Sequence, residues 1–404
     1  MILIAGCATP PPAPQPLPER VPPAPPTLAP APVPEIPTPG VPPLPQVTVP
    51  RYEQAAWTDL PEWGADTAVG VWPGWVRNCA ALRVAPVWQR VCAGAAGVAA
   101  NDAGAQQRYF ESHFTPYRLA NADGTLTGMV TGYYEPLLIG SRKRTARFRY
   151  PLYAPPPDLL TVEIAEINPE LKDKRVRGRV LPSPQGSRVV PYYARAEIAS
   201  GLAPVKGLEI AWVEDPVELF FLQVQGSGRI RLPDGTLMRV GYADHNGHPY
   251  RSIGRWLVDQ GELPIEQASM QGIKAWVKRN PERANEMLNQ NPSYVFFREL
   301  PAGPVDDGPP GSLGVPLTAG RSIAVDPRAV PLGAPVYLAT TWPLSARPLQ
   351  RLVLAQDTGT AIRGTVRADF FWGFGAEAAE QAGRMKQAGR MWLLWPSGEA
   401  LPPG

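Results

Sequence analysis

The sequence predicts a mainly β protein built around a closed barrel, and three observations lead to this prediction. Short apolar runs broken by glycine and proline recur from Leu126 onwards, a pattern typical of strands. Helical patterning is limited to residues 59–120, 252–290 and one late segment, so helices and strands do not alternate as in a parallel doubly wound sheet. The 404 residues show no internal repeat, and their number allows two or three domains. Many short strands with few helices favour a barrel.

The N-terminal segment predicts an exported, lipid-anchored protein. Met1 to Cys7 form a short apolar run that ends in Ile-Ala-Gly-Cys and is similar to the bacterial lipobox, in which the cysteine becomes the lipidated N-terminus. The basic segment that opens a signal peptide is missing, so we expect the true start codon to lie further upstream; the alternative is a chance cysteine. Residues 8–56, rich in proline and alanine, predict a semi-rigid linker that spans on the order of 100 Å at about 3 Å per residue. We expect folded structure from Trp57 and no membrane span, because no other stretch approaches about eighteen apolar residues.

Composition and charge argue against several classes of function. The 39 basic and 36 acidic residues leave a net charge of +3 without a long basic run, so nucleic acid is not expected as a partner. Three histidines and three cysteines do not favour a zinc site, and His245 and His248 fit a turn or a substrate-lining role better than a metal pair. We therefore expect neither a metal nor an organic cofactor. In an exported protein Cys79 and Cys92 are predicted to form a disulfide; the alternative is two buried thiols.

The remaining elements are expected in the following order. Leu219–Gln225 is a mostly apolar run and a candidate buried strand, and Arg229–Val240 predicts a hairpin that turns at Asp234-Gly235. Ser252 is the expected N-cap of one helix, and Asn280-Pro281 the expected start of another. A late helix is predicted from Ala376 to about Gln387. The strands expected in the C-terminal part are Arg321–Asp326, Ala334–Leu338, Leu352–Gly359 and Met391–Trp395.

The twelve tryptophans fit either a core or a sugar-binding surface, because flat indole faces fill cores and also stack on sugars. If the substrate is a glycan, cutting a glycoside requires a proton for the leaving oxygen, which a carboxylic acid usually supplies, and two aspartates are the candidates for this chemistry. Asp357 lies where a predicted strand ends in Gln-Asp-Thr-Gly, and Asp369 is followed by the aromatic residues 370–372, which could shield it from water. The twelve residues between them fit a strand, a turn and a return strand that bring both carboxylates to one cleft. Burial and a neighbouring carboxylate would raise the pKa of Asp369. The alternative is an Asx turn at Asp357 and a loop or helix cap at Asp369.

Several segments together resemble the membrane-bound lytic transglycosylase A family. The matching segments run in the family's order over about residues 60–396 and are Gly132–Pro136, Tyr150–Tyr153 with Pro157–Leu159, Phe221–Gly228, Gly241–Tyr250, Asp326–Gly333 and Gln356–Asp369. The resemblance implies a double-psi β-barrel with a second β-rich domain inserted between its strands and a glycan-binding groove between the two. It places the first part of the barrel at residues 57–147, the insert at 148–297 and the second, catalytic part at 298–396.

The resemblance implies a lytic exotransglycosylase, a lyase that cleaves the β-1,4 bond between N-acetylmuramic acid and N-acetylglucosamine in peptidoglycan and leaves a 1,6-anhydromuramyl product. Motif by motif, the single acid and base falls on Asp369, and the family's second aspartate, which tunes and orients it, falls on Asp357. Asp326 matches a third acidic position, where we favour a structural turn. The expected substrate-binding residues are Tyr134, Glu135, Gln225 and Ser227. The residues themselves do not distinguish endo from exo cleavage.

The resemblance also implies an outer-membrane lipoprotein, anchored through Cys7, that faces the periplasm and remodels peptidoglycan glycan strands, with cell-wall synthesis proteins as candidate partners. Two other functions stay open. An inverting glycoside hydrolase on the same barrel would need its two carboxylates about 6.5–9.5 Å apart with a water between them. A non-catalytic peptidoglycan-binding lipoprotein would be expected to lack one or both aspartates, and both are present.

Overall fold

The computed structural model describes residues 51–66, 70–163, 166–168, 176–359 and 361–402. The predicted lipidation site Cys7 and residues 8–50 of the predicted linker lie outside these residues. The end of the linker prediction is wrong, because Arg51–Gln54 form a strand that pairs with residues 117–120, so regular structure is present before the expected start at Trp57. Thr48–Gly404 form one compact unit. Within the described ranges, no helix is both long and apolar enough to cross a membrane.

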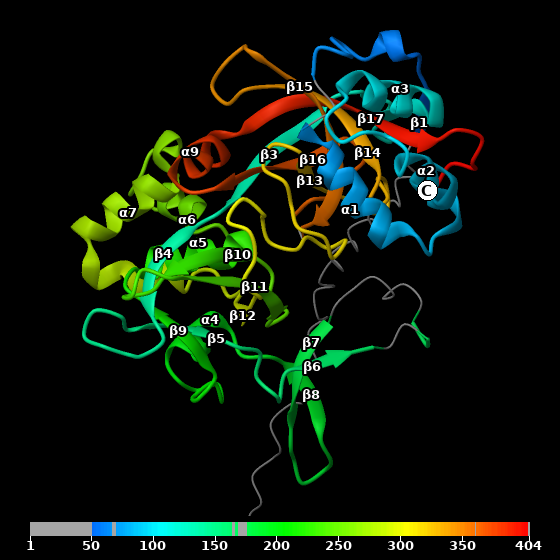
Figure 1. Cartoon of the computed structure of the whole chain (residues 1–404). Coiled ribbons are helices and arrows are strands. Elements are labelled where there is room, and N and C mark those ends of the chain that lie inside the picture. The colour runs from blue at the N-terminus through cyan, green and yellow to red at the C-terminus, as the bar shows by residue number, and fades with distance from the viewer. Residues whose placement is uncertain (1–50, 67–69, 164–165, 169–175, 360, 403–404) are drawn as a thin grey trace, which may run out of the picture. The chain divides into compact units, whose positions relative to one another are not determined.

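Six strands close into a barrel, as the sequence predicts (Figure 1). Their order is β17-β14-β15-β13-β16-β3, and the ring closes because β17 pairs with both β14 and β3. The barrel strands are β3 (Gly128–Glu135), β13 (Ser322–Val325), β14 (Pro335–Thr341), β15 (Pro348–Thr358), β16 (Arg367–Phe374) and β17 (Lys386–Pro396). The sheet continues beyond β17 through β2 (Phe114–Ala120) to β1 (Arg51–Gln54). Closure removes free sheet edges from the barrel, which a twisted open sheet would have to cover.

The other strands form a second β-rich region, which confirms the prediction of an insert between barrel strands. Its six-stranded sheet has the order β12-β11-β10-β4-β9-β5, and a separate three-stranded sheet has the order β6-β7-β8. The strands are β4 (Leu137–Ser141), β5 (Tyr150–Tyr153), β6 (Leu160–Val162), β7 (Val176–Leu181), β8 (Arg188–Pro191), β9 (Glu209–Val213), β10 (Ser227–Arg231), β11 (Leu237–His245) and β12 (Val295–Glu299). The chain leaves the barrel at Pro136, where β3 runs on into β4 (Figure 1). The limits given for the insert, 148–297, stay a prediction.

Helices α1 (Trp72–Leu82), α2 (Pro86–Ala95) and α3 (Ala103–His113) form a layer on the barrel, and the late helix packs separately on β3 and β16. The aromatic residues that α1, α2 and α3 bury share one apolar core with the barrel strands and are Trp72, Trp75, Trp88, Tyr109 and Phe110. The side-chain amide of Asn78 donates to the Gly333 carbonyl at 2.9 Å and ties α1 to the loop before β14. The helical pattern expected up to residue 120 ends at His113, because the next seven residues form strand β2.

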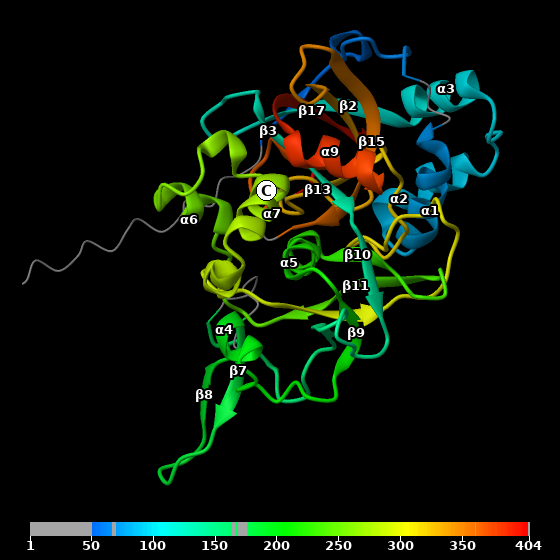
Figure 2. The ribbon, with the colours of Figure 1, turned by 90° about the vertical axis from the view of Figure 1, so that its left-hand side faces the viewer.

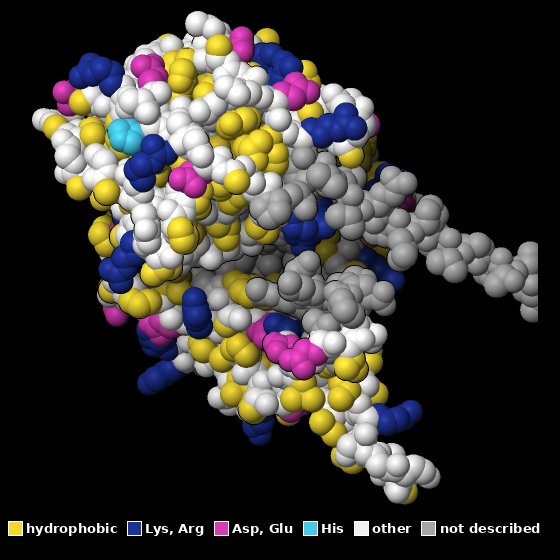
Figure 3. All heavy atoms as spheres, turned by 90° about the vertical axis from the view of Figure 1, so that its right-hand side faces the viewer, with side chains coloured by type: hydrophobic (Ala, Val, Ile, Leu, Met, Phe, Trp, Pro, Cys, Tyr) yellow, Lys and Arg dark blue, Asp and Glu magenta, His cyan; other side chains and the backbone are white. Residues whose placement is uncertain are grey.

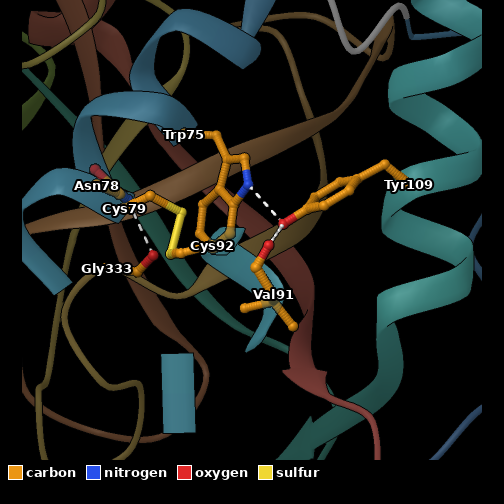
Figure 4. The surroundings of a disulfide bond; sticks show 7 residues. All are labelled: Trp75, Asn78, Cys79, Val91, Cys92, Tyr109 and Gly333. Carbon is orange, nitrogen blue, oxygen red and sulfur yellow. Dashed lines mark hydrogen bonds between the residues drawn. A yellow bond between two sulfur atoms is a disulfide. The ribbon is translucent and has the colours of Figure 1, made fainter. Parts of the chain in front are cut away.

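The disulfide between Cys79 and Cys92 joins α1 to α2 (Figure 4). Beside it, the Trp75 indole donates to the Tyr109 hydroxyl at 3.1 Å, and that hydroxyl donates to the Val91 carbonyl at 2.6 Å. Each polar group on these buried rings thus has a partner, as burial requires. The helical layer is therefore fixed both covalently and by hydrogen bonds from α3 to α1 and α2.

One predicted strand is wrong: Leu219–Gln225 is the C-terminal part of helix α5 (Pro216–Gln225). The Asp215 carboxylate caps this helix by accepting from two backbone N–H groups at 2.8 and 3.1 Å, and Gly226 ends it with a φ of 80°. Figure 2 shows α5 beside β10 and α7, both of which it contacts, and its buried side chains are divided between two apolar clusters. A helix buried on two sides is apolar almost all round, so its sequence looks like that of a buried strand.

The remaining predictions of local structure hold more closely. The hairpin between β10 and β11 turns at Asp234-Gly235, and the Ser252 hydroxyl caps the next helix by accepting a backbone N–H at 3.2 Å. Asn280-Pro281 opens a single 3-10 turn that leads into a short helix. The late helix ends before the predicted Gln387, because strand β17 begins at Lys386. The α-helices that follow α1, α2 and α3 are α4 (Arg195–Ala199), α5, α6 (Ile253–Asp259), α7 (Met270–Arg279), α8 (Ala284–Leu288) and α9 (Ala376–Arg384).

Charged side chains of both signs are mixed on the surface. On the face shown in Figure 3, Lys and Arg side chains are scattered among acidic and apolar ones. Exposed ion pairs include Arg142–Glu299 and Arg255–Asp259, each of which contributes about 0–1 kcal/mol to stability. This mixed surface agrees with the balanced charge of the sequence.

Candidate active site

The two candidate aspartates lie on either side of strand β13. Asp357 on β15 and Asp369 on β16 are both in register with Ala324. Residues in register on neighbouring strands have side chains on the same face, and strands lie about 4.8 Å apart, so the two backbones are about 10 Å apart. A register shift between Ile323 and Ala324 sets Asp357, rather than Gln356, opposite Ala324.

The strand, turn and return strand predicted to join the two aspartates are not what brings them together. β15 and β16 are not neighbours, because β13 lies between them, parallel to β15 and antiparallel to β16. β13 comes from a part of the sequence some thirty residues before Asp357. The aspartates therefore share one face of the barrel sheet through a third strand.

The Asp369 carboxylate is held at one oxygen. Thr131 is its register partner on β3, and the Thr131 hydroxyl donates to Oδ1 of Asp369 at 2.6 Å. Arg367 in turn donates from Nη2 to the oxygen of Thr131 at 2.9 Å, which directs the hydroxyl proton toward the carboxylate. Oδ2 makes no hydrogen bond within the part of the chain that the structure describes. One carboxylate oxygen thus remains available to a substrate.

Burial raises the pKa of Asp369 from 3.8 to about 6, and the negative charge of Asp357 adds to this effect. The hydrogen bond from Thr131 and the positive charge of Arg367 act in the opposite direction. Because burial is the largest cause, the surroundings favour the neutral carboxylic acid. Asp369 can therefore exchange its proton close to neutral pH.

The aromatic shield around Asp369 differs in part from the prediction. Phe371, two residues along the strand and on the same face, packs with Tyr133 in an apolar cluster that also contains Ala324. Phe370 points to the other face and lies in the barrel core. Strand alternation explains the difference, since consecutive residues point to opposite faces.

The Asp357 carboxylate is held at both oxygens. Oδ1 accepts from the backbone and the hydroxyl of Ser312 at 3.0 and 2.9 Å and from the backbone of Thr358 at 2.9 Å. Oδ2 accepts from the hydroxyl of Tyr133 at 3.2 Å. Burial raises the pKa of Asp357, and these hydrogen bonds partly offset that rise. Hydrogen bonds thus fix both oxygens of Asp357, whereas Asp369 keeps one oxygen without a hydrogen bond from the described residues and can gain or lose a proton near neutral pH.

The four residues predicted to bind substrate are near the junction of β3 with the insert, and they differ in exposure. Gln225 is partly exposed and accepts from the backbone N–H of Tyr134 at 3.1 Å. Tyr134 is buried and donates from its hydroxyl to Met270 Sδ, and Ser227 is buried at the start of β10. Glu135 is fully buried in an ion pair with Arg229 at 2.8 Å. Glu135 therefore ties the barrel to the insert in this structure.

Sequence reasoning missed three residues of the site: Thr131, Tyr133 and Ser312. Thr131 and Tyr133 alternate along β3, so they share the face of the aspartates, while Tyr134 points away from it. The alternation is visible in the sequence, but the face that matters is decided only by the pairing of β3 with β16. Ser312 lies in an irregular segment and offers no sequence signal.

The contacts of the other candidate residues, Asp326, His245 and His248, indicate structural rather than catalytic roles. Asp326 is buried, and hydrogen bonds from Arg328 and from the Gly364 backbone outweigh that burial and hold the pKa of Asp326 below 3.8. His248 donates to the Tyr192 carbonyl at 2.7 Å, and His245 accepts a backbone N–H within its own turn. Among the described residues, no group of three or more His, Cys, Asp or Glu side chains could hold a metal ion.

Comparison with known proteins places this site in a family. Two family models match the chain, the MltA specific insert domain over residues 129–298 and the 3D domain over residues 321–395. The membrane-bound lytic murein transglycosylase A of Escherichia coli (strain K12) is 34% identical over 285 residues, which are 69% of this chain and 68% of that protein. The crystal structure of MltA from Neisseria gonorrhoeae is 40% identical with a TM-score of 0.77, covering 87% of this chain and 94% of that chain. The structure of E. coli MltA with bound chitohexaose is 28% identical with a TM-score of 0.60, covering 81% and 90%.

The barrel, the insert and these matches define a polysaccharide-cleaving lyase whose substrate is peptidoglycan. The chain belongs to the membrane-bound lytic murein transglycosylase A family, which confirms the resemblance seen in its sequence. It is therefore a peptidoglycan lytic transglycosylase.

Proposed function

We propose that the chain cleaves the β-1,4 bond between N-acetylmuramic acid and N-acetylglucosamine without water, and that Asp369 acts first as the acid and then as the base. In the first step the neutral Asp369 carboxyl gives its proton to the leaving N-acetylglucosamine oxygen as the bond from that oxygen to C1 breaks. In the second step the carboxylate takes the proton of the muramyl 6-hydroxyl, whose oxygen closes onto C1. The product is a 1,6-anhydromuramyl end, and Asp369 regains its proton.

The proposal rests on the state of Asp369, which combines one free carboxylate oxygen with a pKa of about 6. At pH 7 about one tenth of such a carboxyl is protonated, against about 0.1% for a free aspartate. A group that acts as acid and then as base works best when its pKa lies near the working pH. Asp369 has this property, and its free oxygen is the atom from which the proton would be transferred.

The hydrogen bonds of Asp357 favour lytic cleavage over hydrolysis. An inverting hydrolase needs its second carboxylate to activate a water molecule. Both oxygens of Asp357 already accept hydrogen bonds, from Ser312 and Thr358 on one side and from Tyr133 on the other. We therefore assign to Asp357 the role of raising the pKa of Asp369 through its negative charge, which these hydrogen bonds hold at a fixed position near Asp369.

We further propose an outer-membrane lipoprotein, anchored at Cys7 and facing the periplasm, that remodels cell-wall glycan strands. The word membrane-bound in the name of the E. coli relative supports membrane association. The Cys79–Cys92 disulfide supports an oxidising compartment. The chitohexaose bound to E. coli MltA supports a glycan strand as the substrate, with Gln225 as the best exposed of the predicted substrate-binding residues. Cell-wall synthesis proteins stay candidate partners.

The test is digestion of purified peptidoglycan by the wild type and by Asp369→Asn, with mass spectrometry of the released muropeptides. The proposal expects products one water lighter than reducing muropeptides from the wild type and none from the variant. Reducing-end products would instead mean hydrolysis and would assign the general-base role to Asp357. Full activity of Asp369→Asn would remove Asp369 from the mechanism.

A further inference from the structure

An irregular segment, residues 300–321, leads from β12 of the insert back to β13 of the barrel. Part of it forms a loop that closes on itself, because the backbone N–H of Gly308 donates to the Leu317 carbonyl at 2.9 Å. Ser312 lies within this loop and donates to Oδ1 of Asp357 from its backbone and its hydroxyl. The position of the loop therefore decides how one oxygen of Asp357 is held.

The loop also packs on the face of the sheet that carries both aspartates. Leu317 belongs to the apolar cluster that contains Tyr133 and Phe371. A Cβ atom at Gly308 would lie 2.8 Å from Cε1 of Phe371, so the loop backbone lies directly against this ring. A displaced loop would therefore disturb the surroundings of both carboxylates.

Two arginines of the insert hold the start of the loop and the residues just before it. On β10, Arg229 donates from Nη1 to the Val305 carbonyl at 2.7 Å and from Nη2 to the Asp307 carbonyl at 3.1 Å. On β11, Arg239 donates from Nη2 to the carbonyls of Asp307 and Gly308 at 3.1 and 2.6 Å. Because these carbonyls accept from charged groups, the loop cannot shift without losing several strong hydrogen bonds.

Arg229 also contacts two strands of the barrel. Its Nε donates to Oε2 of Glu135 on β3 at 2.8 Å, and its Cζ lies 4.1 Å from the ring centre of Phe374 on β16. Arg229 is 2% exposed, and a planar guanidinium group serves several acceptors in fixed directions. One buried side chain thus joins the loop to β3 and β16, the strands that carry Tyr133 and Asp369.

We infer that Arg229, assisted by Arg239, is a positioning residue for the reaction and fixes Asp357 through the loop and β3. The loop supplies Ser312 to one oxygen of Asp357, and β3 supplies the hydroxyl of Tyr133 to the other. Because Arg229 binds both the loop and β3, it sets these two supports relative to each other. Its effect on the reaction is therefore indirect and passes through Asp357.

The inference rests on the proposed function, in which the charge of Asp357 raises the pKa of Asp369. Tyr133 and Arg367 are the other titratable or charged groups recorded beside the two carboxyls. Hydrogen bonds from Ser312 lower the pKa of Asp357, so a displaced loop would raise this pKa and reduce the negative charge of Asp357. The pKa of Asp369 would then fall, and the alkaline fall of kcat/KM would move to lower pH.

The test compares three variants of the full-length chain. Arg239→Met removes two hydrogen bonds to the loop and leaves the ion pair between Arg229 and Glu135 in place. Arg229→Lys keeps a positive charge beside Glu135, but an ammonium group cannot replace a planar fork that serves three acceptors. Arg195→Met is the matched control, because Arg195 is likewise an arginine of the insert that donates to two backbone carbonyls, and these lie outside the loop.

Arg239→Met and Arg229→Lys should each lower kcat on purified peptidoglycan about tenfold and change KM less than about twofold. Both should move the alkaline fall of kcat/KM, measured from pH 5 to 8, to lower pH, whereas Arg195→Met should leave it at the wild-type position. Denaturant unfolding of each variant measures the loss of stability. A purely structural role would lower stability and the amount of active protein without moving the pH profile.

A double variant shows whether Arg239 acts through Ser312. The loss of kcat in Ser312→Ala with Arg239→Met should be smaller than the product of the two single losses by about threefold or more, because both changes disturb the same support of Asp357. Losses that multiply, or a pH profile of Arg239→Met or Arg229→Lys like that of Arg195→Met, would overturn the inference. This coupling is measurable whichever ends the products carry, so a failure of the lytic mechanism is distinguished from a failure of the inference.

Discussion

Replacing Asp369 by asparagine should stabilise the protein at neutral pH while it abolishes cleavage. Burial raises the pKa of this carboxyl from 3.8 to about 6, so the folded protein disfavours the charged form. The folded state then binds the proton more tightly than the unfolded state, and the carboxylate reduces stability most at pH values above 6. This reduction fades as the pH falls from 6 toward 3.8. Asparagine has nearly the same shape and carries no charge, so it removes the penalty.

The two pKa values set the size of this effect. They give a penalty of about 3 kcal/mol at pH 7.5 and about 0.5 kcal/mol at pH 4. Because Asp369 is partly exposed, these figures are upper limits. Asp369→Asn should therefore raise the free energy of unfolding by up to about 3 kcal/mol at pH 7.5 and hardly at pH 4. Denaturant unfolding at both pH values measures the difference.

Asp326 offers a control of opposite sign. Its pKa is held below 3.8 by hydrogen bonds from Arg328 and from the backbone of Gly364, so its charge stabilises the fold above pH 4. Asp326→Asn should lower the free energy of unfolding at pH 7.5. If Asp369→Asn also lowered the free energy of unfolding at pH 7.5, the fold would not disfavour the charged form of Asp369. The raised pKa that keeps part of Asp369 protonated near neutral pH would then be contradicted.

Three further predictions concern the site and the helical layer. Thr131→Val removes a hydrogen bond that lowers the pKa of Asp369, so the alkaline fall of kcat/KM, measured on peptidoglycan from pH 5 to 8, should move to higher pH. Asp357→Asn removes a charge that raises this pKa, so the same fall should move to lower pH; shifts in one direction for both variants would contradict the account. Replacing Cys79 and Cys92 by serine opens a loop with a sequence separation of 13 and should lower the free energy of unfolding by about 3 kcal/mol in a denaturant titration, whereas an unchanged value would mean that the disulfide adds no stability.

The sequence was sufficient for the type of fold but not for every element in it. Apolar runs broken by glycine and proline allowed the barrel strands to be predicted, because the pattern of residues along a strand is visible within a short segment. Leu219–Gln225 was misread, since a helix buried on two sides has no polar face to reveal its period. Local signals for the helix were nevertheless present, namely Asp215-Pro216 at its start and Gly226 at its end.

The relative positions of the site residues could not be predicted from short segments of the sequence. Both aspartates could be selected from their neighbours in the sequence, but their relation depends on Ala324, which pairs with both from a distant strand. A single register shift in β13 decides that Asp357 and not Gln356 lies in register with Ala324. Thr131 was missed for the same reason, since only the pairing of β3 with β16 brings its hydroxyl to Asp369. Strand pairing over long sequence distances is not encoded in any short segment.

The central claim, that one carboxyl group cleaves peptidoglycan without water, is tested most directly by digestion in water enriched with heavy oxygen. Lytic cleavage closes the muramyl 6-oxygen onto C1, so the account predicts anhydromuramyl ends that carry no heavy oxygen, and their loss in Asp369→Asn. Heavy oxygen at C1 of the new muramyl ends would show that water attacked this carbon, and would contradict the account.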